Sequence, residues 1–174
     1  MPRTLCAAFH AKIDEQMERA AHLAARFPAD KLHCRFDPPD GWTVCDLLGH
    51  LLDCMAGYCA ALYAAEPGRL AHFEQLRELP VNRSISPEEF RTQLEVYKTR
   101  IAEGFALLDD ADLARNIPTV FVPAGVPLVT LLLGNLEHVI NHKRQLFEFL
   151  KRVDSNIGTA DLYRILRSST DSAV

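Results

Sequence analysis

The sequence predicts an all-α protein: a four-helix bundle with an extended excursion between helices three and four and a short C-terminal helix. Apolar residues recur at helical spacing in four long segments, helix-start motifs precede two of these segments, and a proline-rich stretch interrupts the pattern before the last one. Four amphipathic helices of this length bury their apolar faces against one another, which is the architecture of a bundle.

The first helix is predicted from about Thr4 to Phe27, where apolar side chains recur at helical spacing and charged residues fill the opposite face. We expect Thr4 to act as its N-cap and Pro28 to end it. Both expectations rest on local backbone chemistry. A threonine hydroxyl can accept a hydrogen bond from an N–H of the first turn, and a proline cannot continue a helix because it lacks the N–H.

The second helix is predicted from Val44 to about Ala65. Thr43 fits the N-cap, and Asp46 can return the hydrogen bond in an arrangement like a capping box. Trp42 and Leu47 occupy the two positions of a hydrophobic staple. This start should therefore be well defined.

The third helix has the clearest start in the chain, because Ser86 can cap it, Pro87 takes the first helical position and Glu89 can close a capping box. Its apolar face continues to about Leu108. The preceding residues, 68–85, are mixed in character and are interpreted as a short helix or a packed loop.

Residues 109–127 contain three prolines and several β-branched residues, which indicates extended chain, with a hairpin tip at 123–125. The fourth helix is predicted from Leu128 to Val153, and a short amphipathic helix follows Thr159. We interpret residues 1–167 as one domain, with 168–174 as a frayed tail.

Composition narrows the classes of partner. Hydrophobic residues make up 48% of the chain and charged residues 24%, as in a globular domain, and the formal net charge is -4. A nucleic-acid binder usually carries a basic excess or stripe, so we expect no nucleic-acid partner. The densest basic cluster is interpreted as a solvated helix face; its residues are Lys143, Arg144, Lys151 and Arg152.

The sequence also predicts a soluble protein of a reducing compartment. Its apolar runs are too short to span a bilayer, so we expect no membrane partner. The chain has five cysteines, an odd number without a CxxC pair, and shows no export signal. We therefore expect reduced thiols and a cytoplasmic location.

Two histidines in the fourth predicted helix point to metal chemistry. His138 and His142 stand at i and i+4, so their imidazoles lie side by side one turn apart, at the spacing of two ligands to one ion. Val139 takes the place of the glutamate of an HExxH motif, which argues against a zincin-type protease. The pair alone leaves open whether the two histidines bind a metal ion together or are solvated or hydrogen-bonded separately.

His50 lies on the strongly apolar second helix, where an ionisable side chain needs a partner. It is either a core histidine bonded to a carbonyl or carboxylate, or a third metal ligand supplied by a facing helix. The residues by themselves leave both interpretations open.

Two stretches together resemble the DinB-like (DinB/YfiT) family of four-helix bundles. They are 41–51, with a tryptophan at the helix start and His50 before a leucine, and 138–146, with the histidine pair, a basic residue and Gln-Leu. The resemblance implies that His50, His138 and His142 bind one divalent metal ion, nickel, zinc or iron. The chain departs from the family pattern at Asn141 and Arg144, neither of which replaces a ligand.

Four nearby side chains are candidates to lie beside the metal ligands: Asp46, Cys54, Asn135 and Gln145. Asp46 has a competing role as a helix cap, and Cys54 as a buried core thiol. Asn135 and Gln145 share the face of the histidine pair, so they either fix an imidazole tautomer or make contacts between helices.

Three protein ligands with an open position are typical of a catalytic rather than a structural metal site. The resemblance implies a thiol S-transferase or a hydrolase that acts on a small molecule, with a low-molecular-weight thiol as a candidate substrate, and a homodimer. Surplus apolar surface is also expected on the first helix and after Thr159. The alternative is a non-catalytic bundle that binds a metal or a small molecule, because the sequence shows no general base at an obvious spacing from the histidines.

Overall fold

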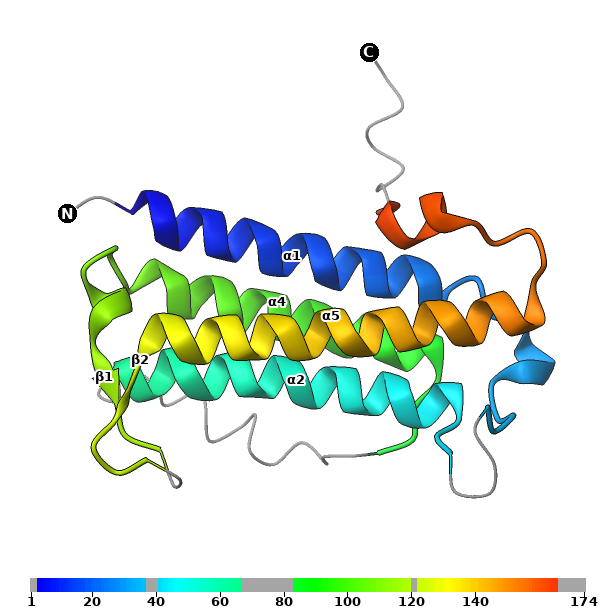
Figure 1. The fold of residues 1–174 in the computed structure, drawn as a ribbon, viewed down its shortest axis with the longest axis horizontal. Helices are drawn as coiled ribbons and strands as arrows, with labels where there is room; N and C mark the ends of the chain where they lie inside the picture. The colour runs from blue at the N-terminus through cyan, green and yellow to red at the C-terminus, as the bar shows by residue number, and fades with distance from the viewer. Residues whose placement is uncertain (1–2, 37–40, 67–82, 120–121, 166–174) are drawn as a thin grey trace, which may run out of the picture.

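Four long helices lie side by side in the computed structural model, which describes residues 3–36, 41–66, 83–119 and 122–165 (Figure 1). They are α1 (Thr4–Ala24), α2 (Val44–Ala65), α4 (Pro87–Ala106) and α5 (Leu128–Val153). Both α1 and α2 pack mainly on α4 and α5, so α1 and α2 occupy diagonal positions. The predicted all-α four-helix bundle is confirmed.

The second and fourth predicted helices, α2 and α5, pack on each other and run in opposite directions. In Figure 1, α1 and α5 run one way, and α2 and α4 run the other way. The packed pair α2 and α5 is therefore antiparallel, and its facing side chains come from segments far apart in the sequence. The candidate metal ligands all lie on this pair.

The capping motifs define the starts of α2 and α4. Thr43 Oγ1 accepts from the Asp46 backbone N–H (3.1 Å), and the Asp46 carboxylate accepts from the Thr43 N–H (2.9 Å), which confirms the predicted box. Ser86 caps α4 as predicted, accepting from the Glu89 N–H at 3.1 Å. The Glu89 carboxylate accepts instead from Gln93 Nε2, so the predicted reciprocal bond of that second box was wrong.

The first helix differs from the prediction at both ends. Thr4 lies inside α1, whose N-cap is Arg3, and neither supplies a side-chain cap. Asp110 does this from outside the helix, since its Oδ1 accepts from the N–H groups of Leu5 and Cys6, each at 3.0 Å. At the other end α1 stops at Ala24, three residues short of the predicted end.

The segment between α4 and α5 is extended over only part of the predicted stretch 109–127. After the short 3-10 helix η3 (Asp112–Ala114), β1 (Asn116–Ile117) pairs antiparallel with β2 (Val126–Pro127). Gly125 has a φ of +91°, and a Cβ there would lie 2.9 Å from the Asn116 Cβ. A glycine is therefore needed where the ladder turns back.

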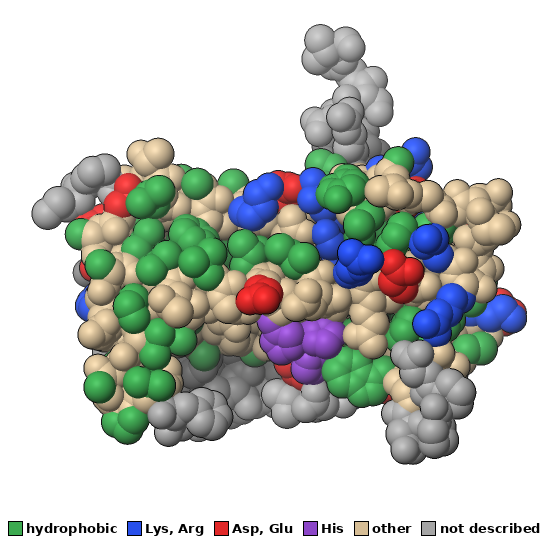
Figure 2. Space-filling view, viewed as in Figure 1, with side chains coloured by type: hydrophobic (Ala, Val, Ile, Leu, Met, Phe, Trp, Pro, Cys, Tyr) green, Lys and Arg blue, Asp and Glu red, His purple; other side chains and the backbone are tan. Residues whose placement is uncertain are grey.

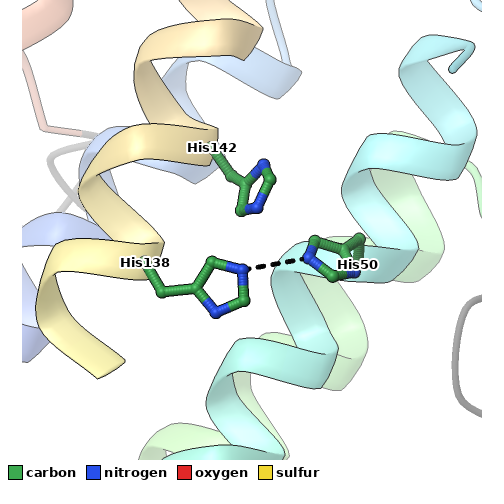
Figure 3. Close-up of side chains that lie close together, drawn as sticks. All are labelled: His50, His138 and His142. Carbon is green, nitrogen blue, oxygen red and sulfur yellow. Dashed lines mark hydrogen bonds between the residues drawn. The ribbon is translucent and has the colours of Figure 1, made fainter. Parts of the chain in front are cut away.

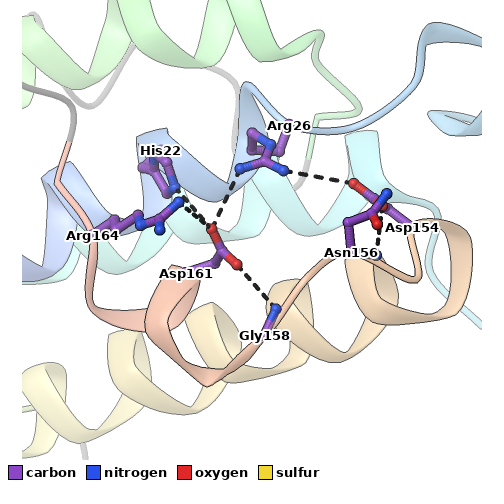
Figure 4. Close-up of polar contacts among 7 residues, drawn as sticks. All are labelled: His22, Arg26, Asp154, Asn156, Gly158, Asp161 and Arg164. Carbon is purple, nitrogen blue, oxygen red and sulfur yellow. Dashed lines mark hydrogen bonds and ion pairs between the residues drawn. The ribbon is translucent and has the colours of Figure 1, made fainter.

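The predicted short C-terminal helix is present as the 3-10 helix η4 (Thr159–Tyr163), and it packs on α1. Another short 3-10 helix, η1 (Ala29–Lys31), follows α1. Asp161 holds η4 in place (Figure 4): it accepts from the Gly158 N–H (3.0 Å), Arg26 (3.3 Å) and Arg164 (3.1 Å). The hydrogen bond from the Gly158 N–H is the largest cause that keeps the pKa of this carboxyl low. Asp161 is therefore an anion and forms ion pairs with Arg26 and Arg164.

The core runs the length of the bundle, and two expectations about its polarity need correction. By length and mean hydropathy α2 is apolar enough to cross a membrane, contrary to prediction, but 67% of its most apolar window is buried inside the bundle. Lys143 is 4% exposed rather than solvated, and its Nζ donates to Gln16 Oε1 at 2.7 Å. Burial lowers the pKa of Lys143 to about 8.

Two expectations lie outside the described residues. The short helix or packed loop expected between the second and third helices falls almost wholly in 67–82, and the expected frayed tail is 168–174. The single-domain boundary at residue 167 stays a prediction.

Candidate metal centre

Three histidines from two helices converge at one place on the bundle (Figure 3). His50 lies in the first half of α2, while His138 and His142 lie one turn apart on α5 and point toward it. Within the described residues they form a group of side chains able to hold a metal ion. His138 is exposed, and Figure 2 shows histidine at the surface on the face formed by α5 and α2.

The spacing of the imidazole nitrogens suits one ion. His50 Nε2 and His138 Nε2 are 3.2 Å apart, and one ligand nitrogen from each histidine lies within 4.8 Å of the others. Bonds of about 2.0–2.1 Å in a tetrahedral site place ligand nitrogens about 3.4 Å apart. The nitrogens of His50 and His138 are therefore close to the separation expected of two ligands to one ion, and the third nitrogen lies within 4.8 Å of both.

Polar side chains lie behind two of the three imidazoles: a hydrogen-bond partner at His142 and a nearby carboxylate at His50. His142 Nδ1 lies 3.1 Å from Gln145 Oε1, so this nitrogen carries the proton and donates it. His50 Nδ1 lies 3.9 Å from Asp53 Oδ2, which favours the same tautomer by charge. Both contacts favour the tautomer in which Nε2 is the nitrogen able to bind a metal.

Electrostatics favour the neutral imidazole, which is the form that binds a metal. Burial is the largest cause that lowers the pKa of His138, and His50 lowers it further. Burial also lowers the pKa of His142, although its bond to Gln145 opposes the shift. Positive charges on neighbouring imidazoles repel each other, so the close approach of the three rings disfavours imidazolium, the form that cannot bind a metal ion.

Trp42, just before the cap of α2, covers one side of the site. Its ring centroid lies 4.6 Å from that of His50 and 5.6 Å from that of His142. The sequence predicted a staple partner for Leu47 here and missed this contact with the histidines. A tryptophan eight residues, or about two helical turns, before a candidate ligand was the available signal.

The other candidates beside the ligands have separate contacts. Asp46 is engaged in the capping box of α2. Cys54 is buried and donates to the His50 carbonyl oxygen (3.3 Å), and burial raises its thiol pKa to about 12. Asn135 packs against Gly57 of α2, where an added Cβ would lie 2.7 Å from its Oδ1. Of the four, Gln145 is the one that hydrogen-bonds to an imidazole ring of the triad within the described part of the chain.

The family follows from a comparison of the whole chain. The model of the DinB superfamily matches residues 12–146, a range that contains all three histidines. The chain therefore belongs to the DinB superfamily.

A solved structure and the curated proteins were compared as well. The crystal structure of a DinB-like protein, YjoA, from Bacillus subtilis is similar in fold, with a TM-score of 0.63 and 16% sequence identity over 84% of this chain and 92% of that one. At this identity the likeness concerns the fold alone. A search of the curated proteins found no match.

Proposed function

We propose that this protein binds one divalent metal ion through His50, His138 and His142 and uses it in a reaction of a small molecule, of the thiol S-transferase or hydrolase type. The observation that carries the proposal is the convergence of the three imidazoles, with His50 Nε2 and His138 Nε2 at 3.2 Å. An all-nitrogen donor set suits nickel, zinc or iron and does not suit magnesium or calcium.

A divalent ion at this site supplies a Lewis acid that lowers the pKa of a water molecule or a thiol. The chain holds it with three neutral imidazoles, one hydrogen-bonded to Gln145 and one near the Asp53 carboxylate. Trp42 covers one side of the site, and the exposed His138 marks the side open to small molecules.

The nucleophile is proposed to come from outside the protein. Cys54, the thiol nearest to His50 in the sequence, is buried, and its pKa is raised to about 12. Tyr58 is also fully buried, and its hydroxyl pKa is strongly raised. Neither side chain ionises near neutral pH, so a bound thiol or water is the better nucleophile.

The catalytic proposal is tested with protein loaded with zinc, nickel or iron(II). We expect it to accelerate transfer of a low-molecular-weight thiol to 1-chloro-2,4-dinitrobenzene or hydrolysis of 4-nitrophenyl acetate. His142→Ala should remove that rate, because the third ligand is lost. If metal binds tightly but a broad panel of thiols and electrophiles shows no turnover, the non-catalytic alternative of a metal- or small-molecule-binding bundle is supported instead.

We also propose a homodimer and a cytoplasmic location. The expected surplus apolar surface exists at Leu5 (57% exposed) and Tyr163 (58%), and α5 adds Leu133 and Ile140 around a shallow hollow of about 510 Å³. Figure 2 shows hydrophobic side chains gathered on this face over α1 and α5. Light scattering should give twice the chain mass, and Leu133→Glu should yield monomer; a monomeric wild type overturns the dimer.

A further inference from the structure

Trp42 is the single tryptophan of the chain and stands at the edge of the histidine triad. Its ring lies against His50 of α2 and His142 of α5, with centroid distances of 4.6 and 5.6 Å. It therefore bridges the two helices that supply the triad. The ring is 36% exposed, so part of its surface remains available to a molecule that approaches the triad.

Packing of the core does not explain this exposure. Leu47, the expected staple partner of Trp42, is completely buried, whereas Trp42 itself stays partly exposed outside the core. The ring planes of Trp42 and His50 meet at 52°, and those of Trp42 and His142 at 30°, so the indole leans over the two imidazoles. A large aromatic surface held beside candidate metal ligands is well placed to contact whatever binds there.

We propose that Trp42 is a specificity-determining wall of the metal site, which stacks on a planar aromatic group of the thiol or electrophile. This inference rests on the proposed function. An indole face attracts other aromatic rings and organic cations. A divalent ion on three neutral imidazoles leaves the site positive, which disfavours a cationic ligand and leaves an aromatic thiol or electrophile as the better match.

The test uses cobalt(II)-loaded protein, whose visible absorption reports the metal and the binding of a thiol to it. Two probes are titrated: 4-methoxythiophenol, which is aromatic, and 2-mercaptoethanol, which is not. Trp42→Leu should weaken binding of the aromatic thiol roughly three- to tenfold, the range of an aromatic pair. It should leave the aliphatic thiol and cobalt affinity within about twofold, while Trp42→Phe should retain most of the aromatic preference.

Tyr163→Leu is the matched control, because Tyr163 is another exposed aromatic residue and lies on η4, outside the triad. It should change neither affinity. If wild type binds no cobalt, the proposed function fails and this inference falls with it. If cobalt binds but Trp42→Leu weakens both thiols equally, weakens neither, or loses cobalt, the inference alone is overturned.

Discussion

The hydrogen bond between His142 and Gln145 decides which imidazole nitrogen faces the other two histidines. Gln145 Oε1 lies 3.1 Å from His142 Nδ1, one turn further along α5. An acceptor at this position fixes the Nδ1–H tautomer and leaves Nε2 for the ion. The site thus depends on a residue that would not touch the metal itself.

Replacing Gln145 tests this role. Gln145→Leu should lower zinc affinity roughly 10- to 100-fold, because the ring loses its orientation and its preferred tautomer. Gln145→Glu keeps an acceptor and should keep most of the affinity. Competition against a chromophoric chelator measures both, and equal zinc affinity of wild type and Gln145→Leu would refute the role.

The thiols give a second prediction at this scale. Cys34 is exposed, whereas the other four cysteines are buried, and burial raises the pKa of Cys54 and Cys59 to about 12. Raised pKa values suppress the thiolate at any pH up to the pKa, so a shift from pH 7 to 9 should not make those thiols reactive. Native protein should show one fast thiol with Ellman's reagent, and none after Cys34→Ser.

The control is the unfolded chain, in which all five thiols should react because burial is lost. More than one fast thiol in the native protein would contradict the burial of the cysteines of α1 and α2.

The polar residues show what sequence reasoning reaches and where it stops. Asp46 and Ser86 were predicted as capping residues because a cap depends on neighbours within one turn. Asp110, which caps α1 from 104 or more residues away, was out of reach, as was Lys143, whose partner Gln16 lies on another helix. One sequence thus offers candidates for local partners, of which Thr4 and the reciprocal bond of Glu89 failed, whereas tertiary partners cannot be predicted from it.

Among the elements, the first turn of α2 combines stability with the geometry of the site. Thr43 caps the helix between Trp42 on one side and His50 in the second turn. In α4, Ser86 makes the same kind of cap without a neighbouring histidine of the triad. The two caps therefore form a matched pair.

Thr43→Ala and Ser86→Ala should each lower the free energy of unfolding by about 1 kcal/mol, since each leaves an N–H of the first turn without its acceptor. Zinc affinity should fall in Thr43→Ala only, because only that helix start lies between the ligand His50 and the indole of Trp42 that covers it. Urea unfolding measures the first effect and zinc titration the second. Equal zinc affinities of Thr43→Ala and Ser86→Ala would mean that the cap of α2 does not contribute to the metal site.

Two helical glycines give a further comparison. A Cβ at Gly49 of α2 would lie 1.7 Å from the backbone oxygen of Arg83, so the residues that lead into α4 pass directly over this point. At Gly134 of α5 nothing lies within 4 Å of an added Cβ. One glycine is required by a close approach of backbone, and the other is not.

Gly49→Ala should destabilise the fold by about 1–3 kcal/mol or prevent folding, as in overpacked cores. Gly134→Ala should stabilise it by about 0.5–1 kcal/mol, since alanine is the better helix former. Thermal unfolding of the two variants beside wild type gives the sign of each change. A neutral Gly49→Ala would mean that the chain before α4 does not cross there.

At the scale of the whole molecule, the bundle brings together residues that are 88 positions apart in the chain, His50 and His138. Helical periodicity predicts which face each histidine occupies, but not the register in which α2 and α5 meet. The four-helix fold was therefore predictable from the sequence. The meeting of the triad came from the family resemblance, and its geometry came from the structure.

Elemental analysis of the purified protein tests the central proposal most directly, with His50→Ala, His138→Ala and, as control, His33→Ala, an exposed histidine outside the triad. Wild type and His33→Ala should carry about one equivalent of nickel, zinc or iron per chain, and the two triad variants should carry none while keeping their helical circular dichroism. A wild type that stays metal-free after incubation with each ion, or a His50→Ala protein that keeps a full equivalent, would contradict the metal centre.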